Sequence, residues 1–149
     1  MVQHYVLFFL YFMALVKSSI DHVEFELPWI GLGTAGLRTD TTEIVGAAVL
    51  EHNVKLIDTA QAEEWYSEEG VRDGLQAASS SLQTISPVVI VTKIHPRSFA
   101  LDKMRERLER SISLLYDPFN SNNSTVRTEL VVLLHSPRYY NNSLPSTVP

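Results

Sequence analysis

The stretch Val54–Tyr66, VKLIDTAQAEEWY, contains a short apolar run that closes on the acid Asp58. Two later runs have the same form: VVIVTK ends at Lys93, and ELVVLLH ends at His135. Such runs are typical of strands buried on both faces, and the spacing between them leaves room for helices, which predicts βα units in a parallel sheet. Because the carboxyl ends of parallel strands share one edge, we expect Asp58, Lys93 and His135 to meet there.

The composition is that of one globular domain. The chain has 149 residues, of which 45% are apolar and 19% charged, as is usual for a single domain. A net charge of −5 without a long basic run argues against nucleic acid as the main partner. No cysteine is present, which excludes disulfides, thiolate catalysis and cysteine metal sites.

The N-terminus contains an uncharged apolar run, Val6–Val16, of signal-peptide length and too short for an ordinary membrane span. Residues 1–18 are therefore predicted to be a signal peptide cleaved after Ser18, which directs the chain to the secretory pathway. The alternative is an uncleaved anchor or a wrongly assigned start, and with a wrong start the chain is cytoplasmic. The sequence also predicts a glycoprotein, since three asparagines head Asn-x-Ser/Thr sequons: Asn122, Asn123 and Asn141.

Turn signals and amphipathic segments predict the remaining elements. The first elements are a short strand at His22–Leu27, a strand and turn at Trp29–Gly36, and a helix at Thr41–His52 that a left-handed Asn53 ends. A helix capped by Ser67, a polar loop from Ser79 to Pro87 and a helix capped by Ser98 follow. The last elements are a loop at Tyr116–Thr128, a strand at Glu129–His135 and a disordered tail over residues 138–149. The helix after Ser98 has an apolar stripe of Leu101, Met104, Leu108, Ile112 and Leu115. Its arginines and glutamates are predicted to form a solvated face.

Three glycines within Trp29–Gly36, WIGLGTAG, have the G-x-G-x-x-G spacing of a dinucleotide-binding turn. Asp58 stands where such a domain has its acid, about 20 residues further on. However, Asp40 and Glu43 resemble a capping box, which predicts that the helix begins later than in that motif. A small doubly wound, Rossmann-type domain and a plain glycine turn therefore both remain open, and strand order distinguishes the first from a barrel.

The residues at the strand ends suit proton transfer to a carbonyl group. A lysine on a buried strand needs a carboxylate, and Asp58 is the candidate partner of Lys93. The ammonium is expected to lower the pKa of a nearby tyrosine, for which Tyr66 is the candidate, and so make it a general acid. His135 could donate a hydrogen bond to the carbonyl oxygen. No nucleophile and no metal-ligand cluster accompany these residues, so we expect the hydride to come from a bound cofactor and predict no metal site.

The segments GLGTAGL, KLIDTAQ, VIVTKI and LLHSP resemble, in order and approximate spacing, the first four barrel strands of the aldo-keto reductase superfamily. The resemblance implies a (β/α)₈ TIM barrel that reduces aldehydes or ketones with NADPH. It implies the catalytic tetrad Asp58, Tyr66, Lys93 and His135, and a nicotinamide site that includes Gly33, Thr34 and Asp58. In the family pattern the tyrosine follows the acid by five positions, where this chain has Glu63, so Tyr66 takes the role only with a three-residue insertion.

The resemblance covers an N-terminal half only. A (β/α)₈ barrel needs about 250 residues, so residues 19–137 correspond to about the first four βα units of such an α/β barrel, and the chain is interpreted as truncated or a fragment. The missing half implies a second half-barrel chain or a homo-oligomer as partner, besides a small carbonyl substrate. The other class of function left open is a non-catalytic secreted interaction module that offers its open sheet edge to another chain.

Overall fold

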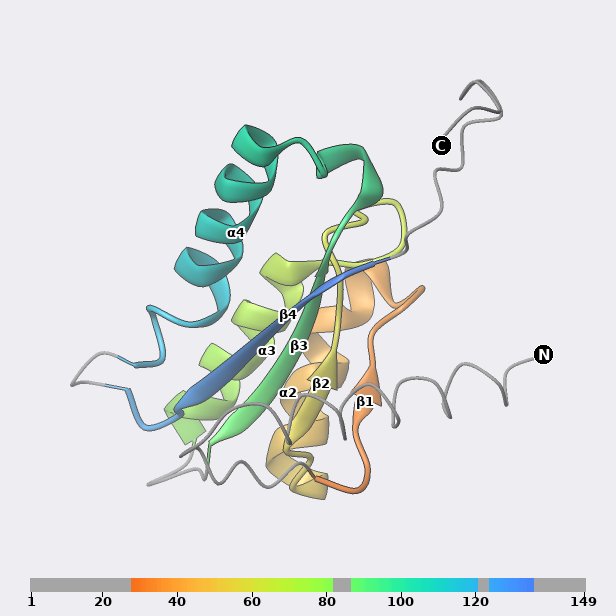
Figure 1. The fold of residues 1–149 in the computed structure, drawn as a ribbon. Helices are drawn as coiled ribbons and strands as arrows, with labels where there is room; N and C mark the ends of the chain where they lie inside the picture. Colours follow the sequence, from red (N-terminus) through yellow and green to blue (C-terminus); the bar gives the residue numbers. More distant parts are fainter. Residues whose placement is uncertain (1–27, 82–86, 121–123, 136–149) are drawn as a thin grey trace.

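The computed structural model describes residues 28–81, 87–120 and 124–135. Four parallel strands lie side by side in sequence order, β1 (Leu32–Gly33), β2 (Leu56–Asp58), β3 (Val88–Ile94) and β4 (Thr128–Leu134) (Figure 1). The protein is therefore an α/β protein with a four-stranded parallel sheet. The order is sequential, and it lacks the reversal that a doubly wound sheet requires. The predictions for the leader, the strand at His22–Leu27, the three sequons and the tail lie outside the described residues.

Helices alternate with the strands. They are η1 (Arg38–Asp40), α2 (Thr41–His52), α3 (Glu68–Ser81), η2 (Pro96–Ser98) and α4 (Leu101–Leu115). In Figure 1, α2 and α3 pass behind β2 and β3, and the core forms between the helices and this face of the sheet. Its buried apolar residues come from all three α-helices, from β2 and β3, and from the segment before β4: Val45, Val49, Ile57, Val71, Leu75, Ala78, Val88, Ile90, Leu115, Phe119 and Val126.

The alternation of side chains along the strands places the predicted site residues on the opposite side of the sheet from this core. Ile57 packs among the helices, and side chains alternate along a strand, so Asp58 points to the other face. The parallel register pairs Gly33 with Asp58, which lies at the end of β2, and Lys93 lies near the end of β3. His135 follows β4, and its backbone N–H donates to Ile94 O at 3.1 Å. The prediction that these side chains share one edge of the sheet is confirmed.

The predicted helix limits are correct where they depend on residues at the helix end itself. The bounds of α2 agree with the sequence, and Asn53 ends it in the left-handed region with φ 51°. Ser67 caps α3, since its Oγ accepts a hydrogen bond from Gly70 N at 2.9 Å. The polar loop was predicted to begin at Ser79, but α3 continues to Ser81.

Two predicted caps are wrong. Asp40 makes no capping bond with its side chain, because η1 holds it in a helical conformation with φ −84° and ψ −4°; a capping residue is normally extended. Ser98 lies inside η2, and α4 begins only at Leu101. Pro96 starts η2 early, and the imidazole of His95 accepts the hydrogen bond from Arg97 N at 3.1 Å. In both places the predicted residue belongs to a 3₁₀ turn that precedes the helix and does not cap it with its side chain.

A glycine contact brings α2 and α3 close together. A Cβ atom on Gly74 would lie 2.7 Å from the backbone oxygen of Thr42 and 3.0 Å from Gly46 N. Real Cβ atoms essentially never show the first of these distances, and the second is tighter than most Cβ contacts. Gly74 lowers the intrinsic helix propensity of α3, yet it permits the close packing of this helix on α2.

The segment predicted as the loop Tyr116–Thr128 contributes to the core. Phe119 and Val126 are 1% and 0% exposed. Asn120 Nδ2 donates to Tyr116 O at 3.0 Å and to Thr128 O at 2.9 Å, which fixes the path of the chain into β4. The described residues of this loop are therefore anchored by both apolar and polar contacts.

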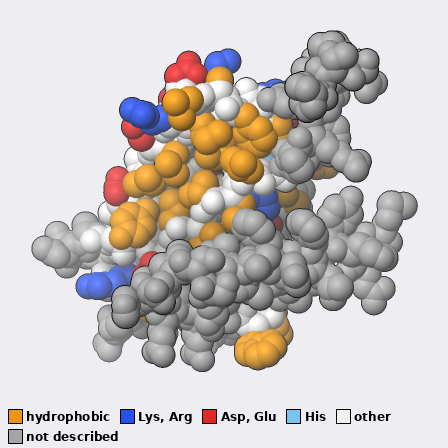
Figure 2. All heavy atoms as spheres, in the orientation of Figure 1, with side chains coloured by type: hydrophobic (Ala, Val, Ile, Leu, Met, Phe, Trp, Pro, Cys, Tyr) orange, Lys and Arg blue, Asp and Glu red, His pale blue; other side chains and the backbone are white. Residues whose placement is uncertain are grey.

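The apolar stripe of α4 is only partly covered. Leu115 is buried, Met104, Leu108 and Ile112 are half-buried, and Leu101 is 76% exposed. At the end of β4, Leu134 is 59% exposed. Figure 2 shows hydrophobic side chains gathered on the surface over α4 and β4. The predicted apolar stripe is therefore buried at the C-terminal end of α4 and exposed at Leu101.

Candidate active site

An ion pair joins the ends of β2 and β3. Lys93 Nζ lies 2.6 Å from Asp58 Oδ1 and 2.8 Å from Thr59 O. The Lys93 side chain is 14% exposed and that of Asp58 is 35% exposed, so the ammonium is the more enclosed partner. The predicted pairing of Asp58 with Lys93 is confirmed. A lysine held in this way keeps a positive charge at the sheet edge.

Replacing Asp58 with alanine should lower the free energy of unfolding by about 1–3 kcal/mol, because the enclosed Lys93 ammonium retains only the oxygen of Thr59. Asp58→Asn should cost less, since it leaves an oxygen in reach. Chemical denaturation measures both. Glu64→Ala is the matched control, because Glu64 pairs with Arg97 and both residues are exposed, and an exposed pair contributes only about 0–1 kcal/mol. Equal losses for the two alanine variants would contradict a role for burial.

Tyr66 lies beside the ion pair and beside His135. It belongs to the loop between β2 and α3, where its backbone N–H donates to Ala62 O at 2.9 Å. Its ring centroid is 5.6 Å from Lys93 Nζ and 6.0 Å from the His135 ring, which it meets edge-on. The structure therefore brings together all four residues predicted for the site: Asp58, Tyr66, Lys93 and His135.

The predicted direction of the Tyr66 pKa is wrong. Burial raises the pKa of Tyr66 above its ordinary value, and the Asp58 carboxylate raises it further. The Lys93 ammonium lies over the face of the ring, and the negative charge of Asp58 disfavours a second negative charge on the phenolate. Tyr66 is consequently a neutral hydroxyl at pH 7, the form that can donate a proton.

His135 has a second imidazole beside it. The ring of His95 lies 6.4 Å from that of His135 and nearly perpendicular to it. Burial lowers the pKa of His135, and the Lys93 and His95 charges lower it further, against the opposing effects of Asp58 and Glu64. His135 is thus favoured in its neutral form, which retains one N–H donor. His95 was not predicted as part of the site, although it follows Lys93 by two positions at the same strand end.

The glycine-rich turn supports the site from β1. Thr34 is buried, and both its backbone N–H and its hydroxyl donate to Asp58 O, at 2.9 and 3.0 Å. Its hydroxyl is therefore engaged in holding β1 against β2. Among the described residues, Gly33 has no atom within 4 Å of the place where a Cβ would lie, so this part of the structure leaves the surface above it open. Gly36 has φ 81°, which explains a glycine there. As the sequence predicted, α2 starts well after this turn.

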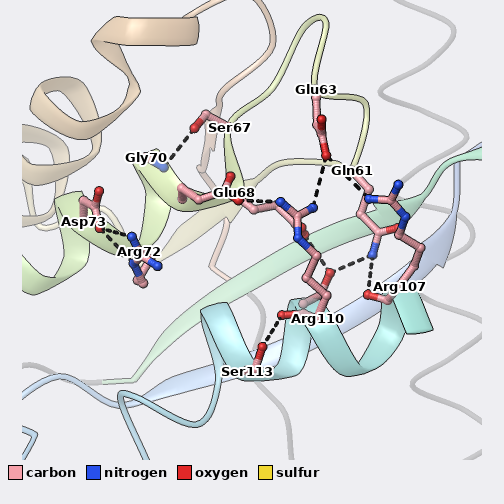
Figure 3. Close-up of polar contacts among 12 residues, drawn as sticks. Gln61, Glu63, Ser67, Glu68, Gly70, Arg72, Asp73, Arg107, Arg110 and Ser113 are labelled. Carbon is pink, nitrogen blue, oxygen red and sulfur yellow. Dashed lines mark hydrogen bonds and ion pairs between the residues drawn. The ribbon is translucent and has the colours of Figure 1, made fainter. Parts of the chain in front are cut away.

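Glu63, at the position where the resemblance implied a tyrosine, pairs with arginines of α4. Figure 3 shows it directed at the arginines of α4, with its Oε1 3.5 Å from Arg107 Nη1 and 3.3 Å from Arg110 Nη1. Arg110 also pairs with Glu69 of α3. The charged side of α4 was predicted to be only a solvated face, but two of its arginines bind the β2–α3 loop and α3.

A buried polar cluster lies below this surface. Glu68 is 3% exposed, and its Oε1 accepts hydrogen bonds from Thr92 at 2.6 Å and from Ser111 at 2.9 Å. Gln61 Nε2 donates to Ser111 Oγ at 2.7 Å and to Arg107 O at 2.8 Å (Figure 3). Glu68 was predicted to lie in the first turn of a helix, and its burial was not predicted. Its position directly after the capping residue Ser67 is the only feature of the local sequence that points to a structural role.

The stability of the protein should depend on pH through Glu68. Burial raises the pKa of Glu68, hydrogen bonds from Thr92 and Ser111 and the charge of Arg110 oppose this shift, and Glu69 adds to it. The folded state therefore binds more protons than the unfolded state between the unfolded pKa of about 4.3 and the higher folded pKa. The stabilisation by the neutral carboxyl is complete below about pH 4.3 and is lost as the pH rises through the folded pKa.

Glu68→Gln, which cannot ionise, should lack this loss, as denaturation across the pH range would show. Glu43→Gln is the control, because Glu43 also lies in the first turn of a helix but is exposed, and that variant should keep the pH dependence of the parent. An identical pH dependence in Glu68→Gln and the parent would contradict this assignment.

Within the described residues, no three histidine, cysteine or acidic side chains are grouped to hold a metal ion, and no helix is long and apolar enough to cross a membrane. Neither protein-family models nor curated proteins gave a match to the sequence. The fold and site define an α/β protein with an enclosed lysine–aspartate pair, a tyrosine and two histidines at one edge of its parallel sheet.

Proposed function

We propose that the chain is the N-terminal half of an aldo-keto reductase-like (β/α)₈ barrel and supplies the proton-donating residues for NADPH-dependent reduction of aldehydes or ketones. The observation that carries this proposal is the meeting of Tyr66 and His135 at the Lys93–Asp58 pair. All four residues lie at the carboxyl edge of the parallel strands, where barrel enzymes have their active sites.

The residues have complementary roles in this reaction. The Tyr66 hydroxyl is protonated at neutral pH, so it can transfer a proton to the carbonyl oxygen of the substrate. Neutral His135 can donate a hydrogen bond to the same oxygen as negative charge develops there. Asp58 and Thr59 hold the Lys93 ammonium over the face of the Tyr66 ring, so a positive charge lies beside the ring that loses its proton.

The open surface at Gly33 fits a flat ring such as nicotinamide, since no side chain of the described residues occupies it. Gly33 and Asp58 would hold this group, and the cofactor supplies the hydride. Thr34 has a different role from the one implied by the family resemblance, because its hydroxyl already donates to the Asp58 backbone. It fixes the β1–β2 edge on which the cofactor would rest.

The fold is compatible with further βα units. The strands run in sequential order, and β4 is an edge strand of the sheet that the described residues form. The exposed Leu101 and Leu134 lie on the elements that a following unit would cover in a barrel. The partner in this proposal is a second half-barrel, either another chain or a second copy.

A fusion experiment tests the proposed function. The chain is joined to the last four βα units of a characterised aldo-keto reductase, and NADPH oxidation is followed with a simple aldehyde. The fusion should reduce the aldehyde. The 149-residue chain alone should not, because its site is accessible to water, which weakens the charge interactions there. Lys93→Met in the fusion is the control that removes the ammonium and should abolish activity. A folded fusion protein without turnover would overturn the proposal.

A further inference from the structure

Both ends of the loop that carries Tyr66 bind a single hydroxyl group on α4. Gln61, before the tyrosine, donates from Nε2 to Ser111 Oγ at 2.7 Å. Ser111 Oγ in turn donates to Glu68 Oε1, after the tyrosine, at 2.9 Å. The three side chains are buried, with Ser111 0% exposed. We call Gln61, Glu68, Thr92 and Ser111 the Ser111 junction.

The Ser111 junction also reaches β3 next to Lys93. Thr92 precedes the lysine and donates to Glu68 Oε1 at 2.6 Å. The backbone N–H of Gln61 donates to Lys93 O at 3.0 Å. Each end of the Tyr66 loop is thus fixed both to α4 and to the strand that carries the ammonium.

Stability alone does not account for this arrangement. Gln61 Oε1 and Glu68 Oε2 are buried and have no hydrogen-bond partner within the described part of the chain. A partly satisfied polar cluster costs stability compared with apolar side chains of the same shape. The effect of the Ser111 junction is to fix the relative positions of three elements, the loop, α4 and β3, because its hydrogen bonds join all three.

We propose that the Ser111 junction holds the Tyr66 ring in place between Lys93 and His135. Its members are positioning residues: they reach the site only through the loop and through β3. The inference rests on the proposed function in treating Tyr66 as the proton donor, but the placement of the ring can be measured without any reaction.

His135 provides the measurement, because the Tyr66 ring packs against it and its titration depends on burial and on Lys93, His95, Asp58 and Glu64. In Ser111→Ala, a displaced Tyr66 admits water, so the pKa of His135 should shift upward toward its ordinary value, as observed by NMR. The His135 signal is assigned by its loss in His135→Gln. Ser113→Ala is the matched control on α4, because Ser113 is exposed and bonds only within the helix, to Arg110 O at 2.8 Å. It should leave the titration unchanged.

Glu68→Gln keeps the shape of the carboxyl group and an oxygen acceptor, so it should retain the His135 titration of the parent. If Ser111→Ala does not fold, Gln61→Met replaces it, since it removes the amide at similar length and should give the same upward shift. A lower melting temperature in the folded junction variant with an unchanged His135 titration would overturn the proposal. An inactive fusion protein with the expected His135 shift would refute the proposed function alone.

Discussion

Turnover by the fusion protein should fall by about 10²- to 10⁴-fold when Tyr66 is replaced by phenylalanine, which is the usual contribution of a positioned general acid. The ring and its packing against His135 remain, so only the proton donor is lost. The measurement is kcat for aldehyde reduction, with NADPH binding determined separately by fluorescence. Binding of the cofactor should be little changed, because the phenol donates its proton only in the transition state.

Tyr116→Phe is the matched control for this experiment. Tyr116 is 40% exposed and follows α4, away from the Lys93–Asp58 pair. Its variant should keep the activity of the parent. Equal activity in Tyr66→Phe and Tyr116→Phe would show that Tyr66 is not the acid.

Phe119→Ala should lower the free energy of unfolding by about 3–5 kcal/mol, the usual cost of truncating a buried phenylalanine. Phe119 is 1% exposed and belongs to the cluster that includes Ile90 and Leu115. Alanine would leave a cavity at the point where α4, β3 and the approach to β4 meet. The chain is short enough for two-state analysis of urea denaturation.

Tyr116→Ala serves as the control here, since it truncates an exposed aromatic residue in the same turn. Its effect should remain within about 0.5 kcal/mol, as is usual for surface positions. If Phe119→Ala costs no more than this, the segment after α4 is a peripheral loop, as the sequence predicted, and does not form part of the core.

Much of the fold could be predicted because its signals are local. The β-branched run before Lys93 favours a buried strand wherever it occurs, and Asn53 tolerates the left-handed conformation that ends α2. The caps at Asp40 and Ser98 were mispredicted for a related reason. A capping serine or aspartate acts only in an extended conformation, and a neighbouring 3₁₀ turn had already fixed the backbone at both positions.

The site was predictable in part. Strand ends at one edge of a parallel sheet must lie near one another, so the meeting of Asp58, Lys93 and His135 follows from the strand pattern. The direction of the Tyr66 pKa does not follow from it. That direction depends on how much water reaches the hydroxyl and on which charge faces it, and both depend on the path of the β2–α3 loop.

The sequence by itself determined the parallel strands, the helix α2 and the edge at which the charged strand ends meet, because each follows from short-range patterns of apolar and turn residues. Only the tertiary structure decided that Glu63 pairs with arginines while Tyr66 approaches Lys93, and that Glu68 is buried at Ser111. The physical reason is that burial of a polar side chain is a joint property of elements far apart in the chain. The local sequence predicts Glu68 as a solvated residue at the start of a helix, and only its contacts with β3 and α4 show that it is buried.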